Sequence, residues 1–142
     1  MKSIRFYSIL VFSVFILWSC SSNDDGPTGP TVSSQVYGTW RMYQLIENNE
    51  LIEDIPCDID IKYKFTSNRN FSKTLFVEAQ NGNSCNESVT IEGEWEVIED
   101  NVLKLNPFID AFDSETVTLE ILNSGDLKIK RSNNSTQIYK RI

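Results

Sequence analysis

The chain has 142 residues with 20 acidic side chains, 13 basic side chains and no histidine, which gives a formal net charge of −7 at pH 7. A surface with this excess of carboxylates repels phosphate backbones, so nucleic-acid binding is disfavoured. The lack of histidine removes the usual imidazole base and a common zinc ligand. We therefore expect no catalytic residues, no metal site and no cofactor.

The first 19 residues have the pattern of an export signal. Two basic residues precede an apolar run over residues 6–18, which is shorter than the roughly 20 residues of a transmembrane helix. The run ends at Leu17-Trp18-Ser19-Cys20, which resembles the lipobox of bacterial lipoproteins. The resemblance implies that residues 1–19 are cleaved off and that Cys20 carries acyl chains such as palmitate. An ordinary signal peptide or an uncleaved anchor is the alternative.

Residues 20–34 are polar and rich in glycine and proline, so we expect a lipidated cysteine followed by a flexible tether. The acidic pair Asp24-Asp25 is similar to export tags that place some lipoproteins on the outer face of the outer membrane. A simple solvated linker is the alternative. We therefore predict a lipid-anchored protein of the outer membrane, on its cell-surface or periplasmic face.

Cys57 and Cys85 are the two thiols left once Cys20 is assigned to the anchor. The exported compartment permits their oxidation, so we predict a disulfide between them. On the chain-entropy model, such a bridge stabilises the fold by about 3.5 kcal/mol. Two free thiols are the alternative, while a catalytic cysteine is disfavoured because no histidine can act as its base.

Beyond Ser34, apolar and polar residues alternate with a period of two between frequent turns, which predicts short β-strands. The expected strands cover residues 37–46, 59–66, 70–78, 89–97, 101–105, 116–121, 126–131 and 136–141. Eight short strands without a long helix favour an all-β domain over residues 35–142. We expect a small eight-stranded antiparallel up-and-down barrel, with a sandwich as the alternative.

The expected connections alternate in length. Those at residues 67–69, 99–100 and 123–125 are tight, whereas those at 47–58, 79–88 and 106–115 are long. In an up-and-down meander, alternate connections lie at the same end. The long loops should therefore cluster at one end of the barrel, together with Cys57 and Cys85.

The first expected strand contains Gly38-Thr39-Trp40, which resembles the G-x-W opening of lipocalins. In that family the tryptophan packs across the closed end of an eight-stranded barrel, often beneath an arginine of the last strand. Arg141 or Lys140 is the candidate here. The wider layout is similar to the lipocalin-like domains of bacterial outer-membrane lipoproteins, with Gly-Glu-Trp at 93–95 and Tyr-Lys-Arg at 139–141. The resemblance implies a non-enzymatic binding fold.

A barrel of eight strands is just wide enough to be filled by its own side chains or to hold one small ligand. The candidate ligand-binding residues are apolar residues at inward strand positions and in the long loops: Ile52, Ile55, Tyr63, Phe65, Leu75, Trp95, Phe108 and Phe112. We expect them to bind a small apolar or amphipathic molecule.

The alternative is a barrel filled by these same residues. Such a protein would serve as an envelope or cell-surface interaction module, with acidic loops that meet a basic partner protein.

Overall fold

The computed structural model describes residues 32–82 and 84–142. The predicted signal peptide, Cys20 and the tether up to residue 31 lie outside the described residues. Residues 32–34, which we assigned to the tether, lie in the short helix α1 (Val32–Gln35). Within the described part of the chain, no helix has the length and apolar character needed to cross a membrane.

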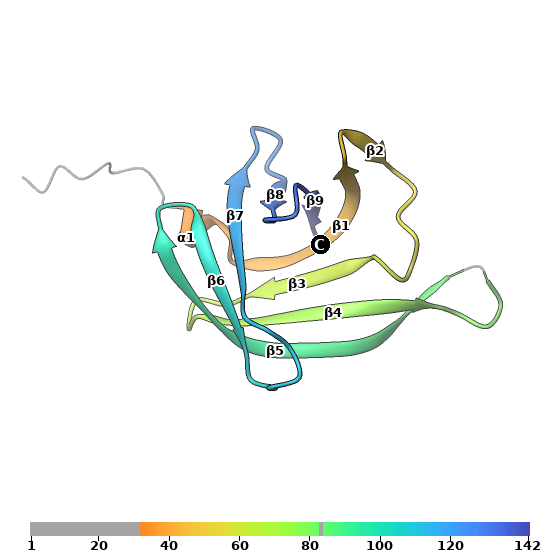
Figure 1. Cartoon of the computed structure of the whole chain (residues 1–142), viewed down its shortest axis with the longest axis horizontal. Coiled ribbons are helices and arrows are strands. Elements are labelled where there is room, and N and C mark those ends of the chain that lie inside the picture. The colour runs from red at the N-terminus through yellow and green to blue at the C-terminus, as the bar shows by residue number, and fades with distance from the viewer. Residues whose placement is uncertain (1–31, 83) are drawn as a thin grey trace, which may run out of the picture.

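Eight antiparallel strands close into a barrel, which confirms the predicted all-β, up-and-down architecture (Figure 1). The strands are β1 (Gly38–Glu47), β3 (Ile61–Phe65), β4 (Asn70–Glu78), β5 (Cys85–Glu99), β6 (Val102–Pro107), β7 (Glu115–Ile121), β8 (Leu127–Lys130) and β9 (Thr136–Arg141). Each pairs with its neighbours in the chain, and β1 pairs with β9 to close the barrel. The short strand β2 (Glu50–Ile52) adds to the end of β1.

The sequence analysis missed β2. It forms a hairpin with β1 in which Glu47 pairs with Glu50, so Asn48 and Asn49 make a two-residue turn. Both have positive φ angles, 52° and 67°. Asparagine tolerates this left-handed conformation, and two such residues in succession match the twist of a hairpin. The Asn-Asn pair was the signal that could have revealed the hairpin.

Strand β5 is longer than predicted and begins at Cys85, which we had placed in a loop. Its central positions Ile91 and Trp95 are buried, but Val89 and Val97 are 44% and 42% exposed. The strand overhangs the barrel at both ends, and with β4 it forms an arm beyond the other strands (Figure 1). Period-two alternation therefore predicted the buried positions Ile91 and Trp95 correctly but not where the barrel ends.

Strand β3 begins two residues later than predicted, at Ile61. The backbone N–H groups of Ile59 and Asp60 donate to the Pro56 carbonyl, at 3.2 and 3.1 Å, so this stretch folds into a turn. The turn follows the predicted disulfide, which the structure confirms: Cys57 and Cys85 are bonded, with their Cα atoms 5.3 Å apart. The bridge fastens the start of β5 to the segment before β3.

Trp40 closes one end of the barrel, as the resemblance implied. It is fully buried, and its indole N–H donates to the Val36 carbonyl at 2.6 Å. The Arg141 guanidinium lies 4.4 Å from the Trp40 ring centre and donates to the carbonyls of Tyr37 and Gln35. This is the end of the tight turns, because the start of β1 pairs with the end of β3.

Gly38 is required at this closed end. Its φ angle of 130° is one that other residues rarely adopt, and a Cβ atom there would lie 2.9 Å from the Arg141 guanidinium. The glycine therefore lets the arginine reach across the tryptophan.

Candidate functional site

The closed half of the barrel interior is filled by aromatic side chains. Tyr63, Phe65 and Trp95 are at most 2% exposed. The Tyr63 ring lies 5.5 Å from Phe65 and 5.6 Å from Tyr139, and Phe65 lies 6.4 Å from Trp95. These three predicted ligand-binding residues are therefore placed in the packed core. Their role in ligand binding stays a prediction.

Toward the open end, the same interior holds polar and charged side chains. Lys73 faces inward because it lies directly between Tyr63 of β3 and Ile91 of β5 in the sheet. Glu115 begins β7, and Arg131 directly follows β8. The side chains of Lys73, Glu115 and Arg131 are 20%, 26% and 15% exposed. We call these three residues the interior charge cluster.

The interior charge cluster is joined by direct contacts. Lys73 Nζ lies 3.4 Å from Glu115 Oε2, and Arg131 Nη1 forms an ion pair with Glu115 Oε1. Arg131 also donates to the Tyr63 hydroxyl at 2.9 Å and to Gln137 Oε1 at 3.0 Å. Glu115 is thus held between two cations, and Arg131 connects it to the aromatic core.

Burial and these contacts shift the pKa of two members of the network. Burial raises the pKa of Tyr139 well above its usual value near 10, and the nearby Tyr63 adds to the shift. Burial alone would lower the pKa of Arg131, but Tyr63 and Tyr139 outweigh it and raise the pKa overall. At neutral pH Tyr139 is therefore a neutral hydroxyl, which donates to Gln137 Oε1 at 2.8 Å, and Arg131 is charged.

A small cavity of about 90 Å³ lies against the interior charge cluster. Lys73 and Glu115 form its polar wall. Its other lining residues are mostly apolar: Phe71, Ile91, Leu105, Pro107, Phe112 and the exposed Asp113. Phe112 comes from the β6–β7 connection and is 38% exposed, so it covers the cavity from the solvent side. A cavity with a charged wall and mostly apolar residues around the rest suits an amphipathic group.

A comparison with protein families identifies the family to which this barrel belongs. Residues 36–139 match the family described as lipocalin-like domain, which covers more than half of the chain. The chain belongs to the lipocalin-like domain family. No curated protein matches the chain. The lipocalin-like fold is typically a binding fold rather than an enzyme. Within residues 32–82 and 84–142, no three His, Cys, Asp or Glu side chains are grouped to hold a metal ion.

The other predicted ligand-binding residues lie outside the 90 Å³ cavity of the lipocalin-like domain. Ile55 and Leu75 are partly buried and pack against the core. Ile52 is partly buried in β2, opposite Leu45. Phe108 is 59% exposed and lines a separate pocket on the outside of the barrel. Of the eight predicted residues, Phe112 is the one that lines the cavity.

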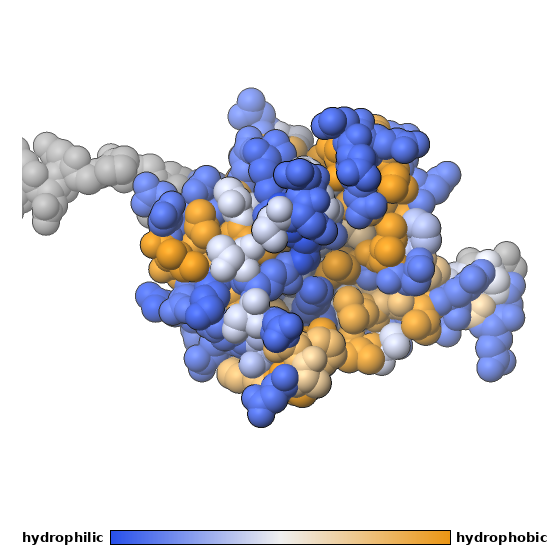
Figure 2. All heavy atoms as spheres, in the orientation of Figure 1, coloured by the Kyte–Doolittle hydropathy of each residue, from blue (hydrophilic) through white to orange (hydrophobic). Residues whose placement is uncertain are grey.

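Apolar residues also gather around the β6–β7 connection of the lipocalin-like domain, at the bottom of the view in Figure 2. Its exposed apolar side chains are Phe108, Ile109 and Phe112. The connection therefore offers an apolar surface beside the cavity.

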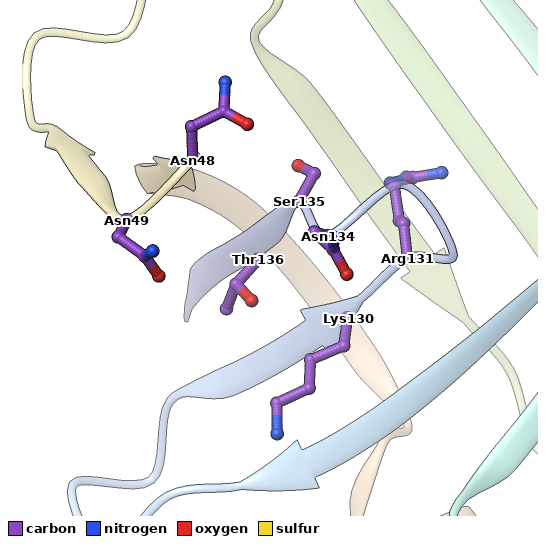
Figure 3. A pocket seen from close by; sticks show the side chains of 7 residues that line it. All are labelled: Asn48, Asn49, Lys130, Arg131, Asn134, Ser135 and Thr136. Carbon is purple, nitrogen blue, oxygen red and sulfur yellow. The ribbon is translucent and has the colours of Figure 1, made fainter.

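A larger polar depression of about 510 Å³ lies elsewhere on the rim of the lipocalin-like domain, between the β1–β2 turn and the β8–β9 turn (Figure 3). Its lining is Asn48, Asn49, Lys130, Arg131, Asn134, Ser135 and Thr136. Figure 3 shows the Arg131 side chain pointing away from the two asparagines of the β1–β2 turn. The Arg131 guanidinium donates hydrogen bonds to Tyr63 and Gln137, so its positive charge lies inside the barrel and not in this depression.

The sequence analysis missed the interior charge cluster, although its pattern carried a signal. Lys73 has the same parity as Phe71 and Leu75, and Glu115 has the same parity as Val117. Arg131 continues the parity of Ile129 in the same way. Polar residues thus stand at expected inward positions of three different strands. Such repeated breaks in the apolar face predict a polar site inside a barrel.

Proposed function

We propose that the protein is a lipoprotein of the outer membrane, anchored through Cys20, whose lipocalin-like domain binds a small amphipathic ligand with an anionic headgroup. The observation that carries this proposal is the interior charge cluster. In this cluster Lys73 and Arg131 share one carboxylate, Glu115, so the three residues together carry a net positive charge within a chain of net charge −7.

The cost of burying charge supports a binding role. Removing ions from water costs several kcal/mol each, and a buried ion pair commonly contributes no more stability than well-packed apolar side chains would. The aromatic core below the cluster shows that this barrel can be filled with apolar groups. Charged residues at inward positions are therefore poorly explained by stability, whereas they suit recognition of a charged ligand group.

The headgroup would bind beside Lys73. A lysine ammonium has three donors, and Lys73 Nζ contacts Glu115 at the long distance of 3.4 Å. The cavity of about 90 Å³ has room for a headgroup and the first carbons of a chain. The remaining apolar part would displace or pack against Phe112 and extend along the exposed apolar residues of the β6–β7 connection.

The place where the described residues begin supports capture away from the membrane. Helix α1 packs against β7 and leads into β1 at the closed end, beside Trp40. A tether from Cys20 would therefore enter at the closed end, so that the open end with the interior charge cluster faces away from the bilayer.

A fluorescent carboxylate, dansyl-undecanoic acid, tests the ligand site. Lys73→Met should weaken its binding about tenfold, the effect of losing one charge-assisted hydrogen bond of about 1.4 kcal/mol. Lys104→Met is the matched control, because the Lys104 side chain on β6 is 42% exposed and lies near Glu96 rather than in the cavity. The uncharged amide of the same probe should bind the wild-type protein as weakly as the carboxylate binds Lys73→Met. Equal affinity of the two variants for the carboxylate would contradict the proposed site.

The anchor is tested separately in bacterial cells that express the full chain. Labelled palmitate should be incorporated into the wild-type protein and not into Cys20→Ser, which should leave the membrane fraction. Retention of Cys20→Ser in the membrane would favour an uncleaved anchor.

A filled barrel that binds a partner protein remains the second candidate function. It is favoured by the close packing of Tyr63, Phe65, Trp95 and Tyr139 in the closed half, which leaves the deep interior no room for a ligand. If no small amphipathic probe binds, the filled barrel that binds a partner protein is the better assignment.

A further inference from the structure

Among the described residues, one edge of β5 has no neighbouring strand over about half its length. β4 pairs with β5 from Cys85 to Glu94, whereas β6 pairs with it only from Gly93 to Glu99. The stretch from Cys85 to Ile91 therefore has β4 on one side and no strand of the described residues on the other. In Figure 1 this part of β5 runs with β4 beyond the β6–β7 connection. We call it the open β5 edge.

Hydrogen bonds at the end of this stretch show which backbone groups face outward. The Phe108 N–H donates to the Glu92 carbonyl at 2.9 Å, on the β6 side, and the Trp95 N–H donates to the Arg69 carbonyl on the β4 side. Successive residues of a strand direct their backbone groups to alternate sides. Thr90 therefore directs its N–H and C=O toward the open β5 edge.

The open β5 edge is held in an extended form before any partner arrives. The disulfide to Cys57 fastens its beginning at Cys85. Near its other end, the hydroxyls of Thr90 and Thr74 are 3.1 Å apart across the β4–β5 ladder. A pre-ordered strand loses little conformational entropy when another strand pairs with it.

The side chains around the open β5 edge are acidic and apolar. Glu92 is exposed directly beside the edge, and no ion pair of the described residues includes it, whereas Glu87 on the edge is paired with Lys62. Val89 is 44% exposed and Phe108, which adjoins Glu92, is 59% exposed. A strand lying along this edge would meet the Glu92 carboxylate at one end and apolar surface at Val89 and Phe108.

We propose that the open β5 edge binds an extended segment of a partner protein in which basic and apolar residues alternate. Backbone hydrogen bonds to an exposed edge supply affinity, and side chains at alternate positions supply specificity. The carboxylate of Glu92, which adjoins the edge, selects for a basic residue in the segment. A second copy of this chain is the poorer occupant, because it has the same net charge of −7.

The ladder between β4 and β5 limits where the segment pairs. Leu75 pairs with Val89 and Phe76 with Glu87, so Ser88 is an extra residue and forms a β-bulge. A bulge increases the local twist of its strand. The incoming segment therefore pairs first with Val89 to Ile91, centred on Thr90.

The test uses a fluorescently labelled seven-residue peptide of alternating lysine and valine, titrated with the purified protein and followed by fluorescence anisotropy. Thr90→Pro removes the outward N–H without removing an N–H from the β4 ladder, and proline is tolerated at such edge positions. Thr90→Val is the matched control, because it loses the same hydroxyl and keeps the N–H. We expect Thr90→Pro to weaken binding at least tenfold and Thr90→Val to stay within twofold of the wild-type protein.

A second form of the probe keeps the test valid if Thr90→Pro fails to fold. A peptide N-methylated at two successive central residues lacks a central N–H on both of its edges, and it should bind the wild-type protein at least tenfold more weakly than the unmodified peptide. Equal binding of the two peptides would overturn the proposal. So would equal binding by the two Thr90 variants, or a dimer of the wild-type protein in sedimentation that Thr90→Pro dissociates.

Discussion

At the closed end of the barrel, Trp40 is fully buried beneath Arg141 and surrounded by apolar side chains, whereas at the open end inward positions hold Lys73, Glu115 and Arg131. Both ends belong to the same strands, and the same alternation directs their side chains inward. The closed end gains free energy from burying apolar area. The open end buries charge, which adds little to stability. The comparison separates the part that holds the fold together from the part that is free to recognise a ligand.

The largest expected effect lies at the closed end. Trp40→Ala removes a fully buried indole and leaves a cavity, so it should lower the free energy of unfolding by about 3–5 kcal/mol. Urea denaturation followed by circular dichroism measures this change. A loss below about 1 kcal/mol would show that Trp40 does not close the core.

The second expected effect is the loss of stability when the disulfide is removed. Replacing both Cys57 and Cys85 by serine releases a crosslink between residues 28 positions apart. The free energy of unfolding should fall by about 3.5 kcal/mol, chiefly because the unfolded chain regains entropy. Urea denaturation under non-reducing conditions checks the value. An unchanged midpoint would mean that the bridge adds no stability.

At the open end, Lys73→Met should change the free energy of unfolding by less than about 1 kcal/mol, in either direction. Glu115 keeps Arg131 as its partner in this variant, so no buried charge is left unpaired. The same urea denaturation compares it with Trp40→Ala. A loss as large as that of Trp40→Ala would erase the proposed difference between the two ends.

A further effect concerns Tyr139 and appears only in alkali. Its pKa in the folded state is raised by burial, while in the unfolded chain it is about 10. The stability that Tyr139 contributes is therefore fully present below pH 10. Above that pH the unfolded state ionises first, so stability falls by at most about 1.4 kcal/mol per pH unit.

Tyr139→Phe should lack this part of the alkaline slope. Unfolding free energies of both proteins between about pH 9 and 11 provide the measurement. Parallel slopes would contradict the raised pKa.

The sequence predicted the barrel from alternation, the closed end from a family resemblance, and the disulfide because Cys57 and Cys85 are the two cysteines left besides Cys20. Alternation reports which face a residue takes, and Gly38-Thr39-Trp40 resembled a known opening. The interior charge cluster depends on barrel closure, which brings β4, β7 and β8 around one interior and sets Lys73 beside Glu115 across 42 positions of sequence. The overhang of β5 depends in the same way on how far β6 extends, which alternation does not encode.

The most direct test of the account is a two-dimensional amide NMR titration of the protein with dodecanoate. The account predicts that the amide signals of Lys73, Phe112 and Glu115 shift with added ligand, while the Trp40 indole signal stays in place. Shifts concentrated at Trp40 and Arg141, or no shifts at saturating dodecanoate, would contradict a ligand site at the open end.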